Sequence, residues 1–232
     1  MLSKTKAIVL HYVKYGSSSI IVTLYSENFG RLTCIANAVR TRKTRMHASF
    51  FQPLTLVELD LYYRQNREIH RIKDIAGFSQ YSSIPFDIRK QTIAFFIAEV
   101  LYRTLPEEES NKALFEFLTN ALICFDEQPD GINDFHLWLL MQLTRYLGIF
   151  PRINQVDKLN TETENHFFNN LSDEIYPYIR DLTGDAYTPP LHLKIPGKIR
   201  ALLLDKIIHY YSLHIEGFSV IKSYPVLMEI FR

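Results

Sequence analysis

The spacing of hydrophobic residues changes once along this chain, near residues 79–85. Before that point apolar and polar residues alternate, which is typical of β-strands with one buried face. After it, apolar residues recur at i, i+3, i+4 and i+7, which is typical of helices that pack through one face. The sequence therefore predicts an α+β protein, with a strand-rich domain over residues 1–80 and an all-α domain over residues 81–232.

Five short runs of strand type fall within the first part, at residues 7–13, 20–25, 31–36, 54–63 and 67–75. In the third run Leu32, Cys34 and Ala36 share one face, and Arg31 and Thr33 share the other. Such short strands leave edges open unless the sheet closes on itself. We therefore expect a five-stranded barrel of the OB-fold type, in which residues 39–51 form the helix or long loop that often interrupts such barrels.

The second part predicts a series of helices. Helical spacing is clear over residues 93–101, 114–125 and 199–211, weaker over 172–182, and a short helix is expected after Pro225. Another helix should run from an Asn133 cap to about residue 147. Because this helix is apolar nearly all round, it should be the central, most buried one. Residues 152–168 are polar and without pattern, so a long loop is expected there.

Charge divides the chain in the same place. Residues 1–80 hold 12 Lys and Arg against 5 Asp and Glu, whereas residues 81–232 hold 14 against 20. The formal net charge of +1 is therefore a cancellation between a basic part and an acidic part. A polyanion is a natural partner for the basic part.

Motifs of catalysis are scarce in this sequence. It contains no phosphate-binding Walker loop and no GxGxxG, and its two cysteines, Cys34 and Cys124, lie far apart. We therefore expect a non-enzymatic protein without metal or cofactor. Two cysteines without a disulfide framework, and an N-terminus without a signal core, favour the cytoplasm. An enzyme acting on nucleic acid remains an open alternative, as does an adaptor whose basic barrel binds an acidic protein.

The densest cationic run is Arg40-Thr41-Arg42-Lys43-Thr44-Arg45. Cations displace counterions from a phosphate backbone and give salt-sensitive binding without sequence preference. Exposed tyrosines, among them Tyr12, Tyr15, Tyr62 and Tyr63, are candidates for stacking on unpaired bases. The predicted DNA-binding residues are Lys4, Lys6, Lys14, Tyr15, Arg31, Arg40, Arg42, Lys43, Arg45, Arg67 and Arg71.

The order and spacing of many residues resemble the RecO family of bacterial DNA repair and recombination mediators. The resemblance begins at Ala7-Ile8-Val9-Leu10 and continues through Ile21–Ser26, Phe29-Gly30-Arg31-Leu32 and Phe51-Gln52-Pro53-Leu54. It returns at Leu143–Pro151 and Ile221-Lys222-Ser223, so that it spans both predicted domains.

This resemblance implies a protein that binds single- and double-stranded DNA and anneals complementary strands. It also implies that the protein works with RecR to load RecA onto strands coated by single-strand-binding protein. The same resemblance implies that the protein binds the acidic C-terminal tail of that coating protein. We expect the chain to be monomeric alone and to associate with the nucleoid. Cations near an apolar groove would pair with the tail. The candidates are Arg145 and Arg152, with Lys198 and Arg200 behind them.

The sequence also departs from the family pattern. Many members carry a four-cysteine zinc site just after the segment that matches Leu147–Pro151, whereas residues 152–168 contain no cysteine. We therefore expect no zinc here. Asn37-Ala38 replaces the basic residue and glycine that are usual at this point, which puts DNA contact at 37–38 in doubt. Ser17 stands where an acidic residue is usual.

Overall fold

A computed structural model describes residues 1–37, 39, 46–105, 110–129, 131–151, 174–184, 189, 193–218 and 220–231. The chain divides into two compact units. The first contains Met1–Asp126 and Ile221–Leu227, and the second contains Glu127–Val220 and Met228–Arg232. None of the helices in these ranges is long and apolar enough to cross a membrane.

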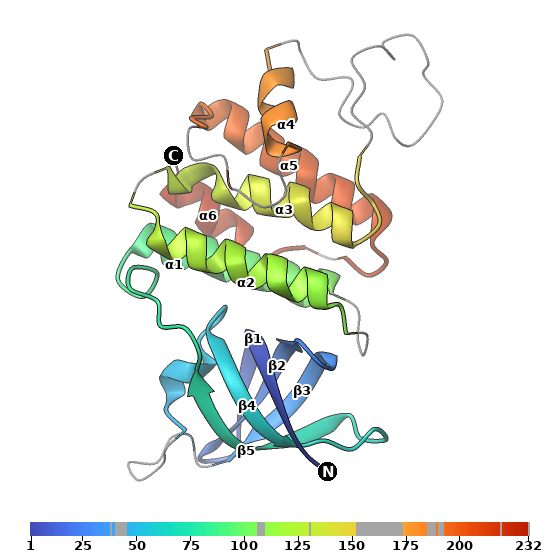
Figure 1. Ribbon diagram of the computed structural model, residues 1–232. Coiled ribbons are helices and arrows are strands. Elements are labelled where there is room, and N and C mark those ends of the chain that lie inside the picture. Colours follow the sequence, from blue (N-terminus) through green and yellow to red (C-terminus); the bar gives the residue numbers. More distant parts are fainter. Residues whose placement is uncertain are drawn as a thin grey trace. The chain divides into compact units, whose positions relative to one another are not determined.

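The first unit is built on a closed barrel of five strands (Figure 1). The strands are β1 (Leu2–Tyr15), β2 (Ser19–Ser26), β3 (Gly30–Ala36), β4 (Leu56–Tyr62) and β5 (Ile69–Gly77). Their order around the barrel is β1-β2-β3-β5-β4, and only the β3–β5 pair is parallel. The predicted OB-type barrel is thereby confirmed, with a short 3-10 helix, η1 (Ala48–Phe51), between β3 and β4.

The alternation of side chains along the strands explains the barrel core. Leu32, Cys34 and Ala36 of β3 are buried in it, while Arg31 and Thr33 on the other face are only half-buried. Strand β1 differs, because its four residues from Ala7 to Leu10 are all buried. Helix α1 (Ile88–Thr104) packs against β1, so the strand is covered on both faces at this point.

The remaining helices follow the predicted series. They are α2 (Lys112–Glu127), η2 (Ile132–Asp134), α3 (Phe135–Tyr146), α4 (Tyr176–Leu182), α5 (Gly197–His214) and α6 (Tyr224–Ile230). Residues 135–144 of α3 are all buried, as its uniformly apolar sequence predicts. The loop predicted over residues 152–168 lies outside the described residues.

The predicted Asn133 cap of α3 is wrong. The helix is preceded by the 3-10 turn η2, and its N-cap residue is Asp134. The Asp134 carboxylate is engaged elsewhere, since Oδ1 accepts from Arg200 Nε at 2.6 Å and Oδ2 accepts from the Ile195 backbone N–H at 3.1 Å. The Asp134 side chain therefore forms a buried ion pair with a distant residue and does not cap the helix.

The strands give way to helices where the sequence predicts, between β5 and α1. The first compact unit nevertheless extends beyond the barrel and includes α1 and nearly all of α2. A division of labour between residues 1–80 and 81–232 remains a prediction.

Candidate nucleic-acid interface

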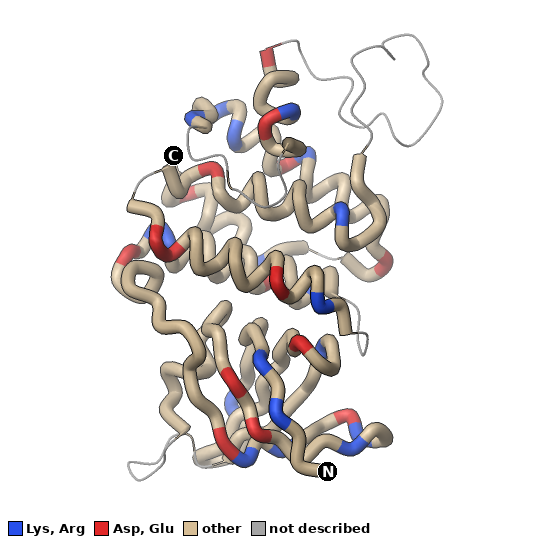
Figure 2. Tube along the Cα trace, viewed as in Figure 1, with Lys and Arg blue, Asp and Glu red and all other residues tan. Residues whose placement is uncertain are grey.

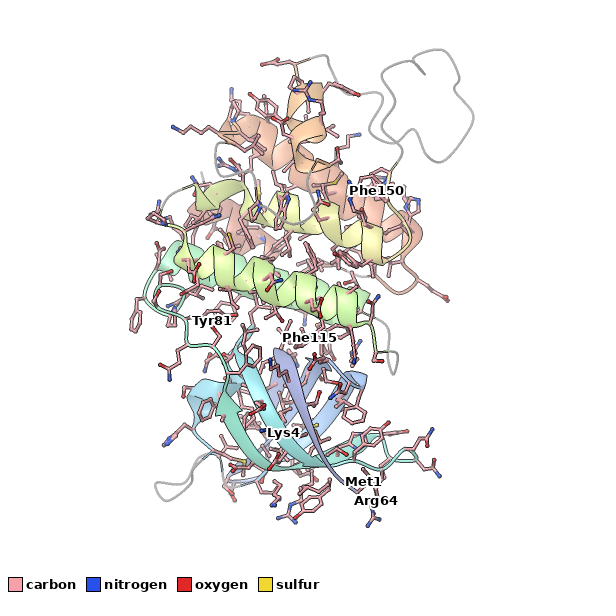
Figure 3. The ribbon with its side chains drawn as sticks, viewed as in Figure 1. Met1, Lys4, Arg64, Tyr81, Phe115 and Phe150 are labelled. Carbon is pink, nitrogen blue, oxygen red and sulfur yellow. The ribbon has the colours of Figure 1, made fainter. Side chains whose placement is uncertain are left out.

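The turn between β4 and β5 gathers exposed cations at one end of the barrel. Arg64 and Arg67 lie in the turn, closed by a hydrogen bond from the Arg67 N–H to the Arg64 carbonyl (3.1 Å), and Arg71 follows on β5 opposite Tyr62. The N-terminal amine of Met1 donates to the Tyr63 carbonyl at 3.0 Å, which brings a further positive charge to this end (Figure 3). We call Arg64, Arg67 and Arg71 the hairpin cations. Such a group can neutralise neighbouring phosphates.

A column of stacked rings supports this hairpin. The Tyr63 ring lies between Phe29 and His70, with centroid distances of 4.3 and 4.8 Å. Tyr63 is therefore a packing residue, whereas Tyr62 beside it is 47% exposed and leaves its ring available for stacking. The sequence named both tyrosines as candidates, and the structure gives them different surroundings.

Basic positions on β1 lie beside acidic positions on β4 (Figure 2). Lys4 Nζ lies 2.9 Å from Glu58 Oε2, and the β1–β4 register places Lys4 opposite Asp60 and Lys6 opposite Glu58. The hydrogen bond and charge of Glu58 raise the pKa of Lys4. Lys6 lies over the Phe78 ring, 5.2 Å from its centre. These lysines therefore add little net positive charge to the barrel surface.

Arg31 lies half-buried against the first helix of the same unit. Its guanidinium lies 4.6 Å from the centre of the Tyr102 ring, and Nη1 donates to the Leu105 carbonyl at 3.4 Å. The His11 ring packs on Tyr102 as well, at 5.0 Å between centroids. The structure thus places this predicted DNA-binding residue in a contact between the barrel and α1.

The turn between β1 and β2 presents the remaining described candidates. Lys14 is exposed, and Tyr15 is 54% exposed just before Gly16, whose positive φ of 58° makes the tight turn possible. The predicted residues Arg40, Arg42, Lys43 and Arg45 lie outside the described residues. Strand β3 ends beside the start of β2, where Ala36 pairs with Ile20.

An aliphatic row on the outer barrel surface was not anticipated from the sequence. The registers place Val13 beside Ile21 and Ile21 beside Ile35, and the row then continues through Arg71 and Tyr62. Val13 is 46% exposed, while Ile21 and Ile35 are half-buried. Alternation along each strand indicates that these residues face outward, but only the pairing of strands brings them together.

The predicted tail-binding cations lie in the second unit, and two of them are engaged internally. Arg145 donates to the Thr183 carbonyl at the end of α4 at 2.6 Å and stacks on Phe150 at 3.7 Å. Arg200 pairs with Asp134, as described above, and also donates to the Ile195 carbonyl at 2.8 Å. Lys198 is exposed, and Arg152 lies outside the described residues.

Metal chemistry has no support in the part of the chain that the structure describes. No three His, Cys, Asp or Glu side chains gather there in a group that could hold an ion. Neither Cys34 nor Cys124 forms a disulfide, and burial raises the pKa of Cys34 to about 12, which makes it a poor metal ligand at neutral pH.

Comparison with known proteins agrees with this architecture. Residues 1–81 match the family model for the N-terminal part of recombination protein O, and residues 85–222 match the model for its C-terminal part. The chain is 34% identical over 248 residues to the DNA repair protein RecO of Bacteroides fragilis, and 35% identical over 242 residues to that of Flavobacterium psychrophilum. Both alignments cover all of this chain and all of the relative. The chain therefore belongs to the RecO family of DNA repair proteins.

Proposed function

We propose that this protein is a non-enzymatic recombination mediator that binds single- and double-stranded DNA and anneals complementary strands. The observation that carries this proposal is the group of hairpin cations beside the exposed ring of Tyr62. Cations along a strand path and rings for unpaired bases are the two elements of single-strand binding by OB barrels. Neither element requires a catalytic group.

Protein partners complete the proposed role. With RecR, the protein would help to load RecA onto strands covered by single-strand-binding protein, and it would bind the acidic tail of that coating protein through its helical part. Lys198 is the exposed described candidate for pairing with the tail, because Arg145 and Arg200 are held by internal contacts. We place this work in the cytoplasm, at the nucleoid, with a chain that is monomeric alone.

A salt titration of binding to single-stranded DNA tests the proposal. We expect log K to fall linearly with log salt, with a slope of about 3 to 5, because each phosphate contact on a single strand contributes about 0.7. Fluorescence anisotropy of a labelled oligonucleotide measures the slope, and a mixture of complementary oligonucleotides measures annealing. Salt-insensitive binding, or no binding at low salt, would remove the proposed function.

The aliphatic row favours a second candidate, an adaptor whose barrel binds another protein. Val13, Ile21 and Ile35 offer no ring for a base, but they suit an apolar protein surface. In that case Ile35→Asp would abolish binding of the protein partner and leave the oligonucleotide affinity within about twofold. Partner binding by a wild-type chain that fails to anneal strands would favour the adaptor over the mediator.

A further inference from the structure

Two adjoining pockets lie on the first unit, on the side of the barrel where α1 packs. The first has a volume of about 500 Å³ and is walled by the rings of Phe50, Tyr81 and Phe95. The second has a volume of about 630 Å³ and shares Pro53 and Phe95 with the first. The two pockets therefore adjoin at these residues, and we call them together the groove; none of the hairpin cations lines it.

The first pocket combines aromatic walls with uncharged polar groups. Among the described residues, every side chain that lines it is uncharged, and Gln52 and Gln80 are exposed at its edge. The Tyr81 hydroxyl donates to the Leu54 carbonyl at 2.7 Å, which fixes this ring in the pocket wall (Figure 3). Flat rings with amide donors and acceptors suit a nucleobase, which stacks through its faces and forms hydrogen bonds through its edges.

Exposed rings mark the entrance to this pocket. Phe95 is 49% exposed, and Phe86, which follows the lining residue Pro85, is 83% exposed. Exposed aromatic rings are the groups on which single-strand-binding proteins stack bases. Phe95 lines both pockets, so a ligand that stacks on it can extend into both.

The second pocket supplies positive charge. Arg103 and Lys222 line it together with His11, and Glu99 is its one carboxylate among the described lining residues. Glu99 accepts from Arg103 Nη2 at 3.0 Å and from the backbone N–H groups of Lys222 and Ser223 at 2.9 and 2.8 Å. Its charge is thus already compensated, and the exposed Lys222 side chain provides a surplus cation.

We propose that this groove is a second single-strand site, which takes an unstacked base against Phe95 in the first pocket and the adjoining phosphate at Lys222 in the second. This inference rests on the proposed DNA-binding function and assigns it a site apart from the hairpin cations. An uncharged aromatic pocket beside a cationic pocket matches the alternation of base and phosphate along a DNA strand. A protein with two such sites can hold two strands at once, which is what annealing requires.

The experiment compares two oligonucleotides of equal length, oligo(dT) and an abasic sugar–phosphate strand, on the full chain. Phe95→Ala is expected to weaken oligo(dT) binding about 5- to 10-fold and leave the abasic strand unchanged, because only stacking is lost. Lys222→Ala is expected to weaken binding of both strands. Leu213→Ala, which replaces a 59% exposed apolar residue outside the groove, should change neither and is the matched control.

A second substitution at the same position adds a fluorescent reporter and tests whether the Phe95→Ala result reflects misfolding. Phe95→Trp keeps an aromatic ring at this position, so oligo(dT) affinity should be retained, and stacking should quench the new fluorescence. The single natural tryptophan, Trp138, is 1% exposed and should contribute a constant background. The site would be overturned if Phe95→Ala bound oligo(dT) with wild-type affinity, or if oligo(dT) did not quench the fluorescence of Phe95→Trp. The proposed function would still stand in that case, provided that the wild-type chain showed the steep salt slope. A wild-type chain that binds neither strand would overturn both.

Discussion

Single-stranded DNA binding is expected to fall about 100-fold at 0.1 M salt when the hairpin cations Arg64, Arg67 and Arg71 are replaced together by alanine. Three lost phosphate contacts should reduce the slope of log K against log salt by about 2, since each contributes about 0.7 on a single strand. At 0.1 M salt a slope change of about 2 equals about two orders of magnitude in affinity. All three side chains are exposed, so the fold should tolerate the change.

The control removes the same charge from the second unit. Arg180, Lys194 and Lys198 are exposed there, and their replacement by alanine should leave the slope unchanged. A companion variant replaces Arg42, Lys43 and Arg45, which the sequence predicts to bind phosphates. If only this companion loses affinity, the hairpin is not part of the strand path, and the assignment of the hairpin cations is refuted.

Sequence reasoning located the cationic barrel but not the surroundings of each cation. The alternation in β3 predicted correctly which side chains face the barrel core, because a residue's face depends only on its own strand. The surroundings of Lys4 depend on the register of β1 against β4, which brings Glu58 and Asp60 beside it from a distant part of the chain. Arg31 meets Tyr102 in the same manner, across an even longer stretch of sequence. No local pattern carries this information.

The helical part shows the same limit. Periodicity predicted where the helices occur, and the apolar sequence of α3 predicted its burial. Local capping rules assigned the N-cap of that helix to Asn133, whereas the N-cap residue is Asp134, whose side chain pairs with the distant Arg200 and does not cap the helix. The groove on the first unit could not be predicted from the sequence either, because its walls come from η1, the segment after β5, α1 and the chain near residue 222. Sites assembled from distant segments need the tertiary structure to be seen.

The first unit should lose about 3–5 kcal/mol of unfolding free energy when Asp126 is replaced by asparagine, because a buried carboxylate network is broken. Asp126 is 5% exposed and ends the part of helix α2 that belongs to this unit. Its Oδ1 accepts from the backbone N–H groups of Ser83 and Ile84 at 2.9 and 2.8 Å, and Oδ2 accepts from that of Ser82 at 2.6 Å. These bonds fix the segment that connects β5 to α1.

A positive charge completes this network. Lys90 is 3% exposed, and its Nζ donates to the Asp126 carbonyl at 2.8 Å and to the Ser83 hydroxyl. An asparagine amide keeps one acceptor oxygen but places its NH2 group where one or two of the three backbone N–H groups donate. It also removes the charge of Asp126, which together with that of Asp87 favours the buried ammonium of Lys90. Thermal unfolding followed by circular dichroism should show the Tm of the variant lowered by about 6–20 °C.

The pH dependence separates this electrostatic cause from lost packing. Burial raises the pKa of Asp126, but the hydrogen bonds from Ile84, Ser82 and Ser83 outweigh it and hold the pKa below the usual value. Its stabilisation is therefore complete above about pH 4, near the unfolded pKa, and declines as the pH falls through the folded pKa. Asp126→Asn should lose this part of the acid sensitivity. Glu127→Gln, at the exposed neighbouring position, should retain both the Tm and the acid profile. Equal Tm values for the two variants would mean that the carboxylate of Asp126 does not hold the connecting segment.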